Sequence, residues 1–442
     1  MSFCSGINML QKEGMGKTIN YYMEPSRRLQ IKAKVDVLVL GGGPAGFSAA
    51  VNAARQGVSV MLVEQAGDVG GVATTGMMSH WTGGTRGGFY EEILKRSGDV
   101  NDKRIDPEQL KTLMLEMLEE AGAILQLYTF AFDAIVDDNT MKGVIIESKS
   151  GREAVLAKVT IDCTGDGDIA AKAGVPYAKG RERDGKMQPM TLMFKVAGVD
   201  MDRAVFPGCF EDNLNIGKGD IQDLGKENIP FPAGHVLLYR SPIPGVVTCN
   251  MTNAIDVDGT RSEDLTKATI LCRRQIEPIV AFLREFVPGY ENCYVISSAS
   301  VIGVRETRHF KGEYTLTEED ILQARVFDDW VVTKAYFNFD VHNVSGNGLD
   351  ETGVQKHFGQ SQGYTIPYRC LVPVHIDNLL LAGRNISGTH MAHSNYRVMP
   401  ICANMGQAAG IAAALAVKEN IVPRMLDVEK IQQILKENGV DI

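Results

Sequence analysis

The first strongly patterned segment of the chain consists of two short apolar runs separated by small residues. Val35–Leu40 and Val58–Val63 are rich in β-branched side chains, which predicts two buried strands. Small residues recur at helical spacing between them, which predicts a helix. Strand, helix and strand in this order predict a βαβ unit with parallel strands.

The turn between the first strand and the helix carries G-x-G-x-x-G at Gly41, Gly43 and Gly46. Glycines here permit a tight turn, a close backbone approach to a pyrophosphate and close packing of the helix on the sheet. The helix N-terminus favours negative charge, and Glu64 after the second strand is placed to accept hydrogen bonds from a ribose. The unit therefore predicts a dinucleotide site formed by Gly41, Gly43, Pro44, Ala45, Gly46, Glu64 and Gln65.

The pattern after this unit favours FAD over NAD. A segment rich in glycine, threonine and serine follows, and such a loop can lie against a long extended cofactor. One predicted helix, Asp106–Ala121, then leads into a β-meander, and no second glycine triplet lies between a strand and a helix. The predicted strands are Ile124–Tyr128, Ala131–Val136, Lys142–Ser148 and Val155–Ile161, and the added cofactor contacts are Gly70, Gly71, Thr74 and Thr75.

Composition and charge exclude several classes of protein. The 442-residue chain has a formal net charge of -9, which argues against binding to nucleic acid. Its first residues lack the pattern of a secretory signal, and its eight cysteines form no C-x-x-C, so we expect a cytoplasmic protein without a metal cluster. The uncharged run from 398 to 417 contains Pro400, Asn404 and Gln407, and predicts a buried helix rather than a membrane span.

Three later segments resemble a known family. They read IDCTGDGDIAAKAGVPYAKG from Ile161, GVRETRHFKGEYTLTEED from Gly303, and AGRNISG followed by RVMPICANMGQAAGIAAAL from Ala382. Together they resemble the bacterial FAD-dependent oxidoreductases related to the fumarate reductase and succinate dehydrogenase flavoproteins. The resemblance implies an α/β fold in which a Rossmann-like FAD-binding domain with a β-meander is interrupted by an α+β substrate domain. It also implies extended FAD with the flavin at the domain interface.

The resemblance also suggests how the chain is divided. We expect an N-terminal arm over residues 1–33, the first part of the FAD-binding domain over 34–173, the substrate domain over 174–344, a mobile loop over 345–363 and the return to the FAD-binding domain over 364–442. Helical periodicity marks Glu263–Phe286 within the substrate domain and Asp427–Asn438 near the C-terminus.

Further cofactor contacts follow from the resemblance. The segment after the strand at Ile161 would bring backbone and a carboxylate to the dinucleotide, and the strand Leu379–Leu381 would return to the pyrophosphate. GQAAGIAAAL is expected to open a helix whose N-terminus points at the flavin, where its dipole would stabilise the reduced ring. The residues expected to make these contacts are Thr164, Gly165, Asp166, Gly383, Arg384, Met405, Gly406 and Gln407.

His80 lies in the region where related dehydrogenases carry a histidine joined covalently to the flavin. The surrounding MMSHWTGG does not match that tethering motif closely. We therefore expect FAD to be bound without a covalent link.

Candidates for the chemistry come from segments that the resemblance places at the domain interface. VIGVRETRHF alternates like a strand, so Arg305 and Arg308 would face opposite sides, one binding substrate and the other pairing with Glu306 or Glu313. Asp340 and His342 form a plausible carboxylate–imidazole pair, against the alternative of a structural hydrogen bond. Tyr314 could donate a proton, but a packed tyrosine is the favoured interpretation. The catalytic candidates are His393, Arg397, Arg305 and His342.

His390 and His393 could form a metal-binding H-x-x-H. No third ligand lies in an obvious motif, and Gly388, Asn395 and Pro400 make a regular helix doubtful here. Because two flavin-contacting elements bracket the segment, we predict no metal and a flavin-side loop with His393 or Arg397 facing the substrate.

The resulting hypothesis is an FAD-dependent oxidoreductase that transfers a hydride between a small polar substrate and flavin N5, with an unknown electron acceptor. Two alternatives stay open. One is a fumarate-reductase-like reduction of a C=C bond, and the other is a non-catalytic flavoprotein subunit that relays electrons to a partner. The sequence leaves the oligomeric state undetermined.

Overall fold

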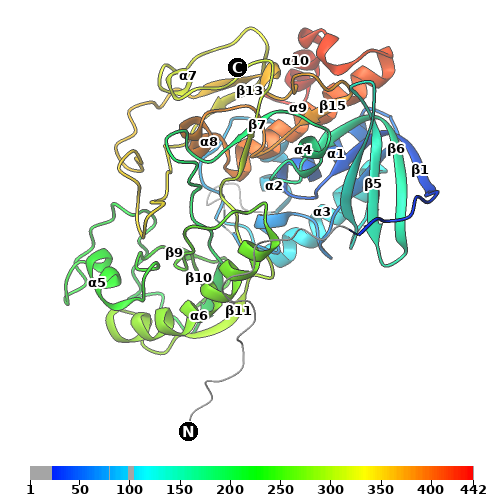
Figure 1. Ribbon diagram of the computed structural model, residues 1–442. Helices are drawn as coiled ribbons and strands as arrows, with labels where there is room; N and C mark the ends of the chain where they lie inside the picture. The colour runs from blue at the N-terminus through cyan, green and yellow to red at the C-terminus, as the bar shows by residue number, and fades with distance from the viewer. Residues whose placement is uncertain (1–21, 79, 98–103, 442) are drawn as a thin grey trace.

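The computed structural model describes residues 22–78, 80–97 and 104–441, and its largest element is a seven-stranded sheet (Figure 1). Its strands follow the order β3-β2-β1-β6-β5-β4, with β15 paired to β6. Those strands are β1 Gln30–Leu40, β2 Val60–Val63, β3 Ile124–Gln126, β4 Phe130–Asp137, β5 Thr140–Ser148, β6 Gly151–Asp162 and β15 Leu379–Leu381. Pairs among β1, β2, β3, β6 and β15 are parallel, whereas β4, β5 and β6 form an antiparallel meander. The predicted Rossmann-like sheet with a meander is confirmed.

Strand β6 joins the two kinds of pairing. Its first half pairs with β5 from Gly151 to Leu156, and its last three residues pair with β15 from Thr160 to Asp162. The chain thus returns to the sheet more than 200 residues later, as the resemblance implied, and β15 ends beside the ends of β1 and β6.

Two helices beside this sheet pack closely against each other. They are α1, Pro44–Arg55, and α9, Met399–Glu419. A Cβ at Gly406 would lie 2.0 Å from the carbonyl oxygen of Ala45, and one at Gly410 would lie 2.3 Å from that of Ala49. By length and composition α9 could cross a membrane, but 89% of its most apolar window is buried within the structure. The expectation of a buried helix is therefore confirmed.

Helix α3, Pro107–Ala121, shows how closely local signals set the boundaries. The Asp106 side chain accepts a hydrogen bond from the Glu108 backbone N–H at 3.1 Å, and Gly122 ends the helix with φ of +77°. The other elements of this region are α2 Gly88–Ser97, α4 Asp168–Lys172 and the 3-10 turn η1 Gly71–Ala73.

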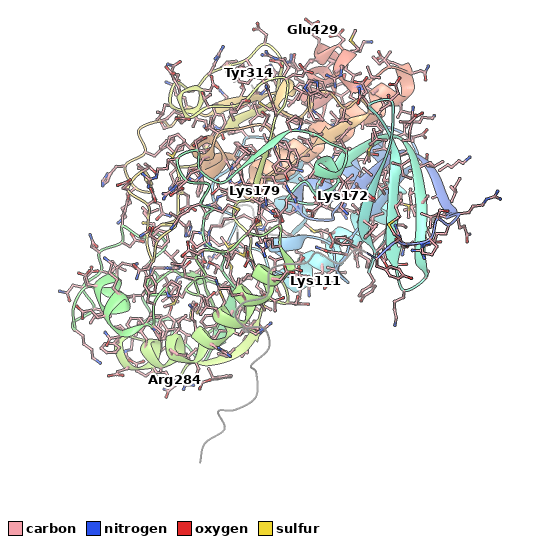
Figure 2. The ribbon with its side chains drawn as sticks, in the orientation of Figure 1. Lys111, Lys172, Lys179, Arg284, Tyr314 and Glu429 are labelled. Carbon is pink, nitrogen blue, oxygen red and sulfur yellow. The ribbon has the colours of Figure 1, made fainter. Side chains whose placement is uncertain are left out.

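A smaller second part has its own core. Its sheet has the order β11-β8-β10-β9, and the long helix α6 lies beside it (Figure 1). Arg284 on α6 and Glu429 on α10 lie near opposite ends of the molecule (Figure 2). The elements are β8 Phe194–Ala197, α5 Ile221–Asn228, β9 Leu238–Arg240, β10 Val247–Cys249, α6 Ser262–Phe286 and β11 Tyr294–Ser298.

Two expected boundaries are wrong. Strand β1 begins at Gln30, because residues 30–33 pair with β6, so the arm ends before 33; residues 1–21 of that arm lie outside the described residues. The return to the large core also comes earlier than 364. Phe310 of β12 and Trp330 of β13 already pack in that core. Strand β12 pairs with β7, and β13 pairs with β14. These strands are β7 Tyr177–Lys179, β12 Arg308–Phe310, β13 Trp330–Ala335 and β14 Tyr364–Pro367.

The rest of the chain completes the large part. Its elements are α7 Glu318–Leu322, η2 Tyr368–Cys370, α8 His390–Tyr396, η3 Pro423–Met425 and α10 Val428–Glu437. The segment 345–363 contains no helix or strand and is tied down by backbone bonds such as Asp350 N–H to Val341 O at 2.9 Å. Its expected mobility stays a prediction. The seven described cysteines are free thiols.

Candidate functional site

The glycine turn between β1 and α1 has the shape that a dinucleotide requires. Gly41 has φ of +88°, and a Cβ at Gly46 would lie 1.7 Å from the Gly41 carbonyl oxygen. A Cβ at Gly43, by contrast, would meet nothing within 4 Å. The N-terminus of α1 has no side-chain cap and begins with Pro44. The turn therefore leaves open space beside uncapped N–H groups of the helix, where a phosphate fits.

Glu64 is fixed at the end of β2. Its Oε2 accepts a hydrogen bond from the Gly42 N–H at 2.5 Å, and its Oε1 accepts one from the Ala66 N–H at 2.7 Å. The carboxylate is therefore held beside the glycine turn, where the motif places the ribose ligand. The Gln65 side chain next to it is exposed, and its contact with the cofactor stays a prediction.

A second glycine turn lies against the first one. Gly70 and Gly71 both have positive φ, and the Gly70 N–H donates to the Gly42 carbonyl at 2.7 Å. The Thr74 hydroxyl donates to the Val69 carbonyl at 2.6 Å, and the Thr75 hydroxyl donates to the Gly71 carbonyl at 2.9 Å. The two threonines thus stabilise this turn, and their cofactor contacts stay predictions.

Arg384 and Asp166 meet on the far side of the glycine turn. Arg384 Nη2 lies 3.1 Å from Asp166 Oδ1, and its Nη1 is buried without a hydrogen-bond partner. A Cβ at Gly165 would lie 2.5 Å from Arg384 Nη2, so the arginine needs this glycine. The Thr164 hydroxyl donates to Asp162, and Gly383 has φ of +107° with its Cβ position 3.3 Å from the Cβ of Ala45. The predicted residues of β6 and β15 therefore do converge beside α1.

Helix α9 begins earlier than expected. Its first residue is Met399, so the interpretation that GQAAG opens a helix is wrong. Met405 and Gly406 lie inside the helix, and the side-chain oxygen of Gln407 accepts a hydrogen bond from the Phe89 N–H at 2.9 Å. The first turn of α9, rather than these residues, carries the positive end of the dipole. Cofactor contacts at Met405, Gly406 and Gln407 stay untested.

The H-x-x-H segment is helical, against expectation. Thr389 caps helix α8 by accepting a hydrogen bond from the Ala392 N–H, and Gly388 and Pro400 lie outside the helix. Asn395 fits inside because its side chain accepts a hydrogen bond from the Tyr364 hydroxyl at 2.7 Å. His390 and His393 consequently lie one turn apart and both are buried.

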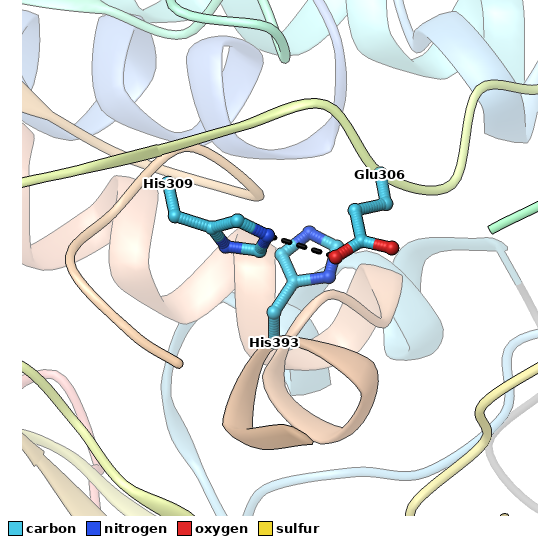
Figure 3. Close-up of side chains that lie close together, drawn as sticks. All are labelled: Glu306, His309 and His393. Atoms are coloured by element: carbon cyan, nitrogen blue, oxygen red, sulfur yellow. Dashed lines mark hydrogen bonds and ion pairs between the residues drawn. The ribbon is translucent and has the colours of Figure 1, made fainter. Parts of the chain in front are cut away.

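Three histidines surround the buried carboxylate of Glu306. Figure 3 shows two of them, His309 and His393, beside Glu306. Its side chain is fully buried, and its Oε1 accepts hydrogen bonds from His309 Nε2 at 2.8 Å and from His390 Nδ1 at 2.5 Å. The His393 ring contacts the His309 ring edge-on at 4.8 Å between centroids. One ligand atom each from Glu306, His309 and His393 lies within 4.8 Å of the others, a spacing that could hold a metal ion. These four residues are called the Glu306 cluster.

The protonation of the Glu306 cluster follows from its contacts. Burial raises the pKa of Glu306, but the hydrogen bonds from His309 and His390 outweigh it and hold the pKa well below its ordinary value. Burial disfavours charge on His390, yet the Glu306 carboxylate raises its pKa overall. Burial, together with repulsion from His309, holds the pKa of His393 well below its ordinary value. Glu306 is therefore ionised at neutral pH, and His393 is uncharged.

The segment that carries the two arginines is not the regular strand expected from its alternation. Only Arg308–Phe310 are in a strand, β12. Arg308 Nη1 donates to Asp168 Oδ1 at 2.8 Å, whereas Arg305 Nη1 donates to the Pro189 carbonyl at 2.6 Å. The expected ion pairs are also wrong, because Glu306 binds His309 and His390 whereas Glu313 pairs with Arg424.

Arg397 forms a second buried group with Asp340 and His342. Arg397 Nη2 donates to Asp340 Oδ2 at 2.9 Å, and His342 Nε2 lies 3.3 Å from the same oxygen. Gln188 joins this group to Glu306: its N–H donates to Glu306 Oε2 at 3.0 Å, and its Oε1 accepts a hydrogen bond from the His342 N–H at 3.2 Å. Arg397, Asp340, His342 and Arg305 are called the Arg397 cluster.

The Arg397 cluster contains more positive than negative charge at neutral pH. Burial raises the pKa of Asp340, but His342, Arg397 and Arg305 together hold it far below its ordinary value. Burial and the charge of Arg305 lower the pKa of His342 to about 4, so its ring is uncharged at neutral pH. Burial and the charge of Arg397 lower the pKa of Arg305 to about 10, which leaves it charged. Two cations thus face one carboxylate.

A cavity of about 370 Å³ opens beside this cluster. Phe210 and His235 line it, and the Phe210 ring packs edge-on against both His235 and His342, with centroids 5.1 and 4.9 Å apart. Gln222, Lys226, Asn343 and Asn347 contribute polar side chains to its wall. We call it the His235 pocket.

Tyr314, considered as a proton donor, and His80, considered as a link to the flavin, both pack against other aromatic rings. The Tyr314 hydroxyl donates to Asp320 at 2.9 Å and its ring packs on Phe327, so it is a structural tyrosine near the surface (Figure 2). The His80 ring stacks on Tyr239 with centroids 5.1 Å apart.

Comparison with known proteins identifies the family. A family profile described as FAD dependent oxidoreductase matches residues 36–435. The chain belongs to the FAD-dependent oxidoreductase family. The expected cofactor and reaction class are thereby confirmed at the level of the family.

Individual relatives are more distant. Digeranylgeranylglycerophospholipid reductase 2 of Methanothermobacter thermautotrophicus is 28% identical over 38% of this chain and 48% of its own length. Fumarate reductase (cytochrome) of Shewanella frigidimarina is 35% identical over 15% of this chain and 14% of its own length. The chain thus spans less than half of each of these relatives. A solved geranylgeranyl bacteriochlorophyll reductase-like protein of Thermoplasma acidophilum covers 92% of this chain and 84% of its own, with 14% identity and a TM-score of 0.47. The narrower relation to fumarate reductase therefore rests on a short match.

The residues present fit FAD, the cofactor of the family. The open space at Gly43 and the uncapped N-terminus of α1 suit the pyrophosphate. Glu64 is oriented for a ribose, and the unpartnered Nη1 of Arg384 suits a phosphate oxygen.

Several residues of the site were not among the sequence candidates for catalysis. Glu306 was expected only as a partner of arginine, and His309, Gln188 and His235 were not among the candidates. They lie between 84 and 205 residues before His393 in the chain, so no local spacing joins them. The one signal in the sequence is the pair of an acid and a histidine in RETRH, within a segment already singled out.

Proposed function

We propose that this protein uses FAD to transfer a hydride between a carbon of a small polar anion and flavin N5. The observation that carries the proposal is the Arg397 side chain, which Asp340 orients while its Nε stays buried without a hydrogen-bond partner. A largely buried, oriented guanidinium with a free donor suits a carboxylate substrate. The polar side chains in the wall of the His235 pocket, among them Asn343 and Asn347, offer hydrogen bonds to a small polar molecule.

The roles of the residues follow from their charge. Arg397 and Arg305 hold the anionic group and orient the reacting carbon. His393 is uncharged at neutral pH and its Nδ1 has no partner, so it accepts the proton that leaves the substrate. The Glu306 carboxylate and His309 fix the surroundings of the His393 ring. Bound FAD supplies the hydride acceptor.

A reductase that acts on an activated C=C bond is the second candidate. The curated relatives named as reductases favour it, and the same arginines would hold a substrate such as an unsaturated acid. In that direction a protonated side chain must supply a proton. His390, whose pKa is raised by Glu306, would be the donor in place of His393.

The test is anaerobic rapid mixing of the FAD-loaded protein with hydroxy acids, sugars and amines, followed by flavin absorbance. We expect an anionic substrate to reduce the flavin and His393→Asn to slow that step about 100-fold or more, with unchanged FAD content. His375→Asn, at an exposed histidine with φ of +68°, is the control. Equal rates for the two variants would return His393 to a structural role. If no compound reduces or reoxidises the flavin, the hydride-transfer proposal fails and the alternative of a flavoprotein subunit that relays electrons to a partner is favoured.

A further inference from the structure

A second cavity lies on a different set of elements, between α2, β13 and the end of the 345–363 segment. Its volume is about 320 Å³, and Thr85, Arg86, Tyr90, Lys334 and Gly363 are among the residues that line it. It shares no lining residue with the His235 pocket. We call it the Tyr90 pocket.

The charge of the Tyr90 pocket is positive, although the whole chain has a net charge of -9. Within the part of the chain that the structure describes, Arg86 and Lys334 form no ion pair or side-chain hydrogen bond. The single acid in the wall, Glu91, is paired with Lys95 at 3.1 Å outside the lining. Two cations are therefore left to attract an anion.

Uncharged donors complete the pocket. Tyr90 is 2% exposed, yet its hydroxyl has no hydrogen-bond partner. Burial raises the pKa of Tyr90 far above its ordinary value, so the hydroxyl keeps its proton. The Thr85 oxygen already accepts a hydrogen bond from Asn404 Nδ2 at 2.9 Å, which leaves its own proton free to be donated. A buried hydroxyl without a partner is costly unless a ligand satisfies it.

The backbone at Lys334 is unusual. This lysine has φ of +48° inside strand β13, at a point where the pairing with β14 shifts register. Gly363 makes that conformation possible, because a Cβ there would lie 2.7 Å from the Lys334 Cα. Left-handed backbone at a residue other than glycine is concentrated at binding sites, where the surrounding structure enforces it.

We propose that the Tyr90 pocket binds the phosphate group of a small molecule. Arginine and lysine are the common protein ligands of phosphate, and hydroxyl donors satisfy its remaining oxygens. The half-exposed Tyr336 ring beside them offers a face for the rest of the molecule. A volume of about 320 Å³ is near the lower end for ligand pockets, which limits the ligand to a small phosphate ester.

Tryptophan emission provides the readout. Trp81 is fully buried and its ring stacks on Tyr90, with centroids 5.6 Å apart, while Trp330 is the second tryptophan of the chain. Trp330→Phe therefore leaves one reporter in contact with the pocket. The FAD-loaded variant is titrated with inorganic phosphate at constant ionic strength, and then with ribose 5-phosphate and with ribose.

We expect a saturable change with both phosphates and none with ribose. Arg86→Gln and Tyr90→Phe, each made in the Trp330→Phe background, should weaken binding about tenfold, because each removes one donor from a phosphate oxygen. Arg86 is exposed, so its replacement leaves the fold intact. Lys418→Ala removes an exposed cation of α9 outside the pocket and should change the affinity less than about twofold.

The outcomes are separable. No saturable change, or equal weakening in Lys418→Ala and Arg86→Gln, overturns the proposal in favour of general charge attraction. Because the readout does not involve flavin reduction, failure here leaves the hydride-transfer proposal untouched.

Discussion

Replacing Glu306 with glutamine tests whether the buried carboxylate is a structural centre of the site. The side chain is fully buried, and three N–H groups donate to it, from His309, His390 and Gln188. Glutamine has nearly the same shape but only one acceptor oxygen. At least one donor therefore faces an NH₂ group, and His390 loses the carboxylate that favours its charge.

The expected magnitude follows from burial. Removing one partner of a buried ion pair costs about 3 to 5 kcal/mol, since the other charge stays in a medium of low dielectric. Glu313→Gln is the matched control, because its ion pair with Arg424 is near the surface. Such pairs contribute about 0 to 1 kcal/mol.

The pH dependence gives a second and more specific signature. His390 has a raised pKa in the folded protein, so its contribution to stability is complete below the ordinary value of 6.5 and is lost as pH rises through the folded value. Glu306 has a lowered pKa, so its contribution is complete above the ordinary value of 4.5 and is lost as pH falls through the folded value. Stability from this pair is therefore complete between 4.5 and 6.5. In Glu306→Gln the fall above 6.5 should be smaller.

Urea unfolding of the FAD-loaded protein, at pH values on both sides of this window, measures both effects. We expect Glu306→Gln to lower the free energy of unfolding by about 3 to 5 kcal/mol at pH 6 and to flatten the alkaline decline. A loss no larger than that of Glu313→Gln would refute the reasoning. An unchanged alkaline slope would show that His390 does not depend on Glu306.

Three further predictions concern the cofactor and the metal question. Gly43→Ala should fold normally, because its Cβ meets nothing within 4 Å, yet it should weaken FAD binding at least tenfold by occupying the pyrophosphate space. Gly359→Ala, whose Cβ also meets nothing within 4 Å, is the control. Equal FAD content in the two variants would contradict the assignment. Acid precipitation should leave the yellow colour in the supernatant, whereas a yellow pellet would indicate a covalent link such as one through His80. Elemental analysis of the purified protein should find no stoichiometric transition metal, since hydrogen bonds from His309 and His390 already occupy Oε1 of Glu306. One zinc per chain that is lost in His393→Ala would instead make the Glu306 cluster a metal site.

Local patterns predicted those elements whose signals lie within a few residues. The cap at Asp106 and the glycine at 122 fix α3 to within a residue of the predicted start, and the two turns of the meander separate β4, β5 and β6 where expected. The start of α9 was misplaced, because its alanine-rich pattern is strongest after Gly406, whereas the helix starts at the residue before Pro400, and proline is well suited to a first turn. The helix at His390 was missed for a related reason: Asn395 looks unfavourable in a helix until Tyr364, far along the chain, supplies its partner.

The dinucleotide turn could be read from sequence because one βαβ unit contains all of its parts. The catalytic candidates could not be placed in the same way. Arg397 and His342 were both predicted as catalytic candidates, but Asp340, which contacts both of them, was expected to pair only with His342. The cluster around Glu306 combines residues from a loop, a short strand and a helix. Such a cluster is set by tertiary packing alone.

Gln188 connects the Glu306 cluster to the Arg397 cluster by hydrogen bonds. Its backbone N–H binds the Glu306 carboxylate, and its side-chain oxygen accepts a hydrogen bond from the backbone of His342, while its Nε2 is buried without a partner. Gln188 therefore contacts both clusters. Since an unpaired amide donor is costly in a buried site, a substrate oxygen that accepts from Gln188 would be bound between the arginines on one side and the histidines on the other.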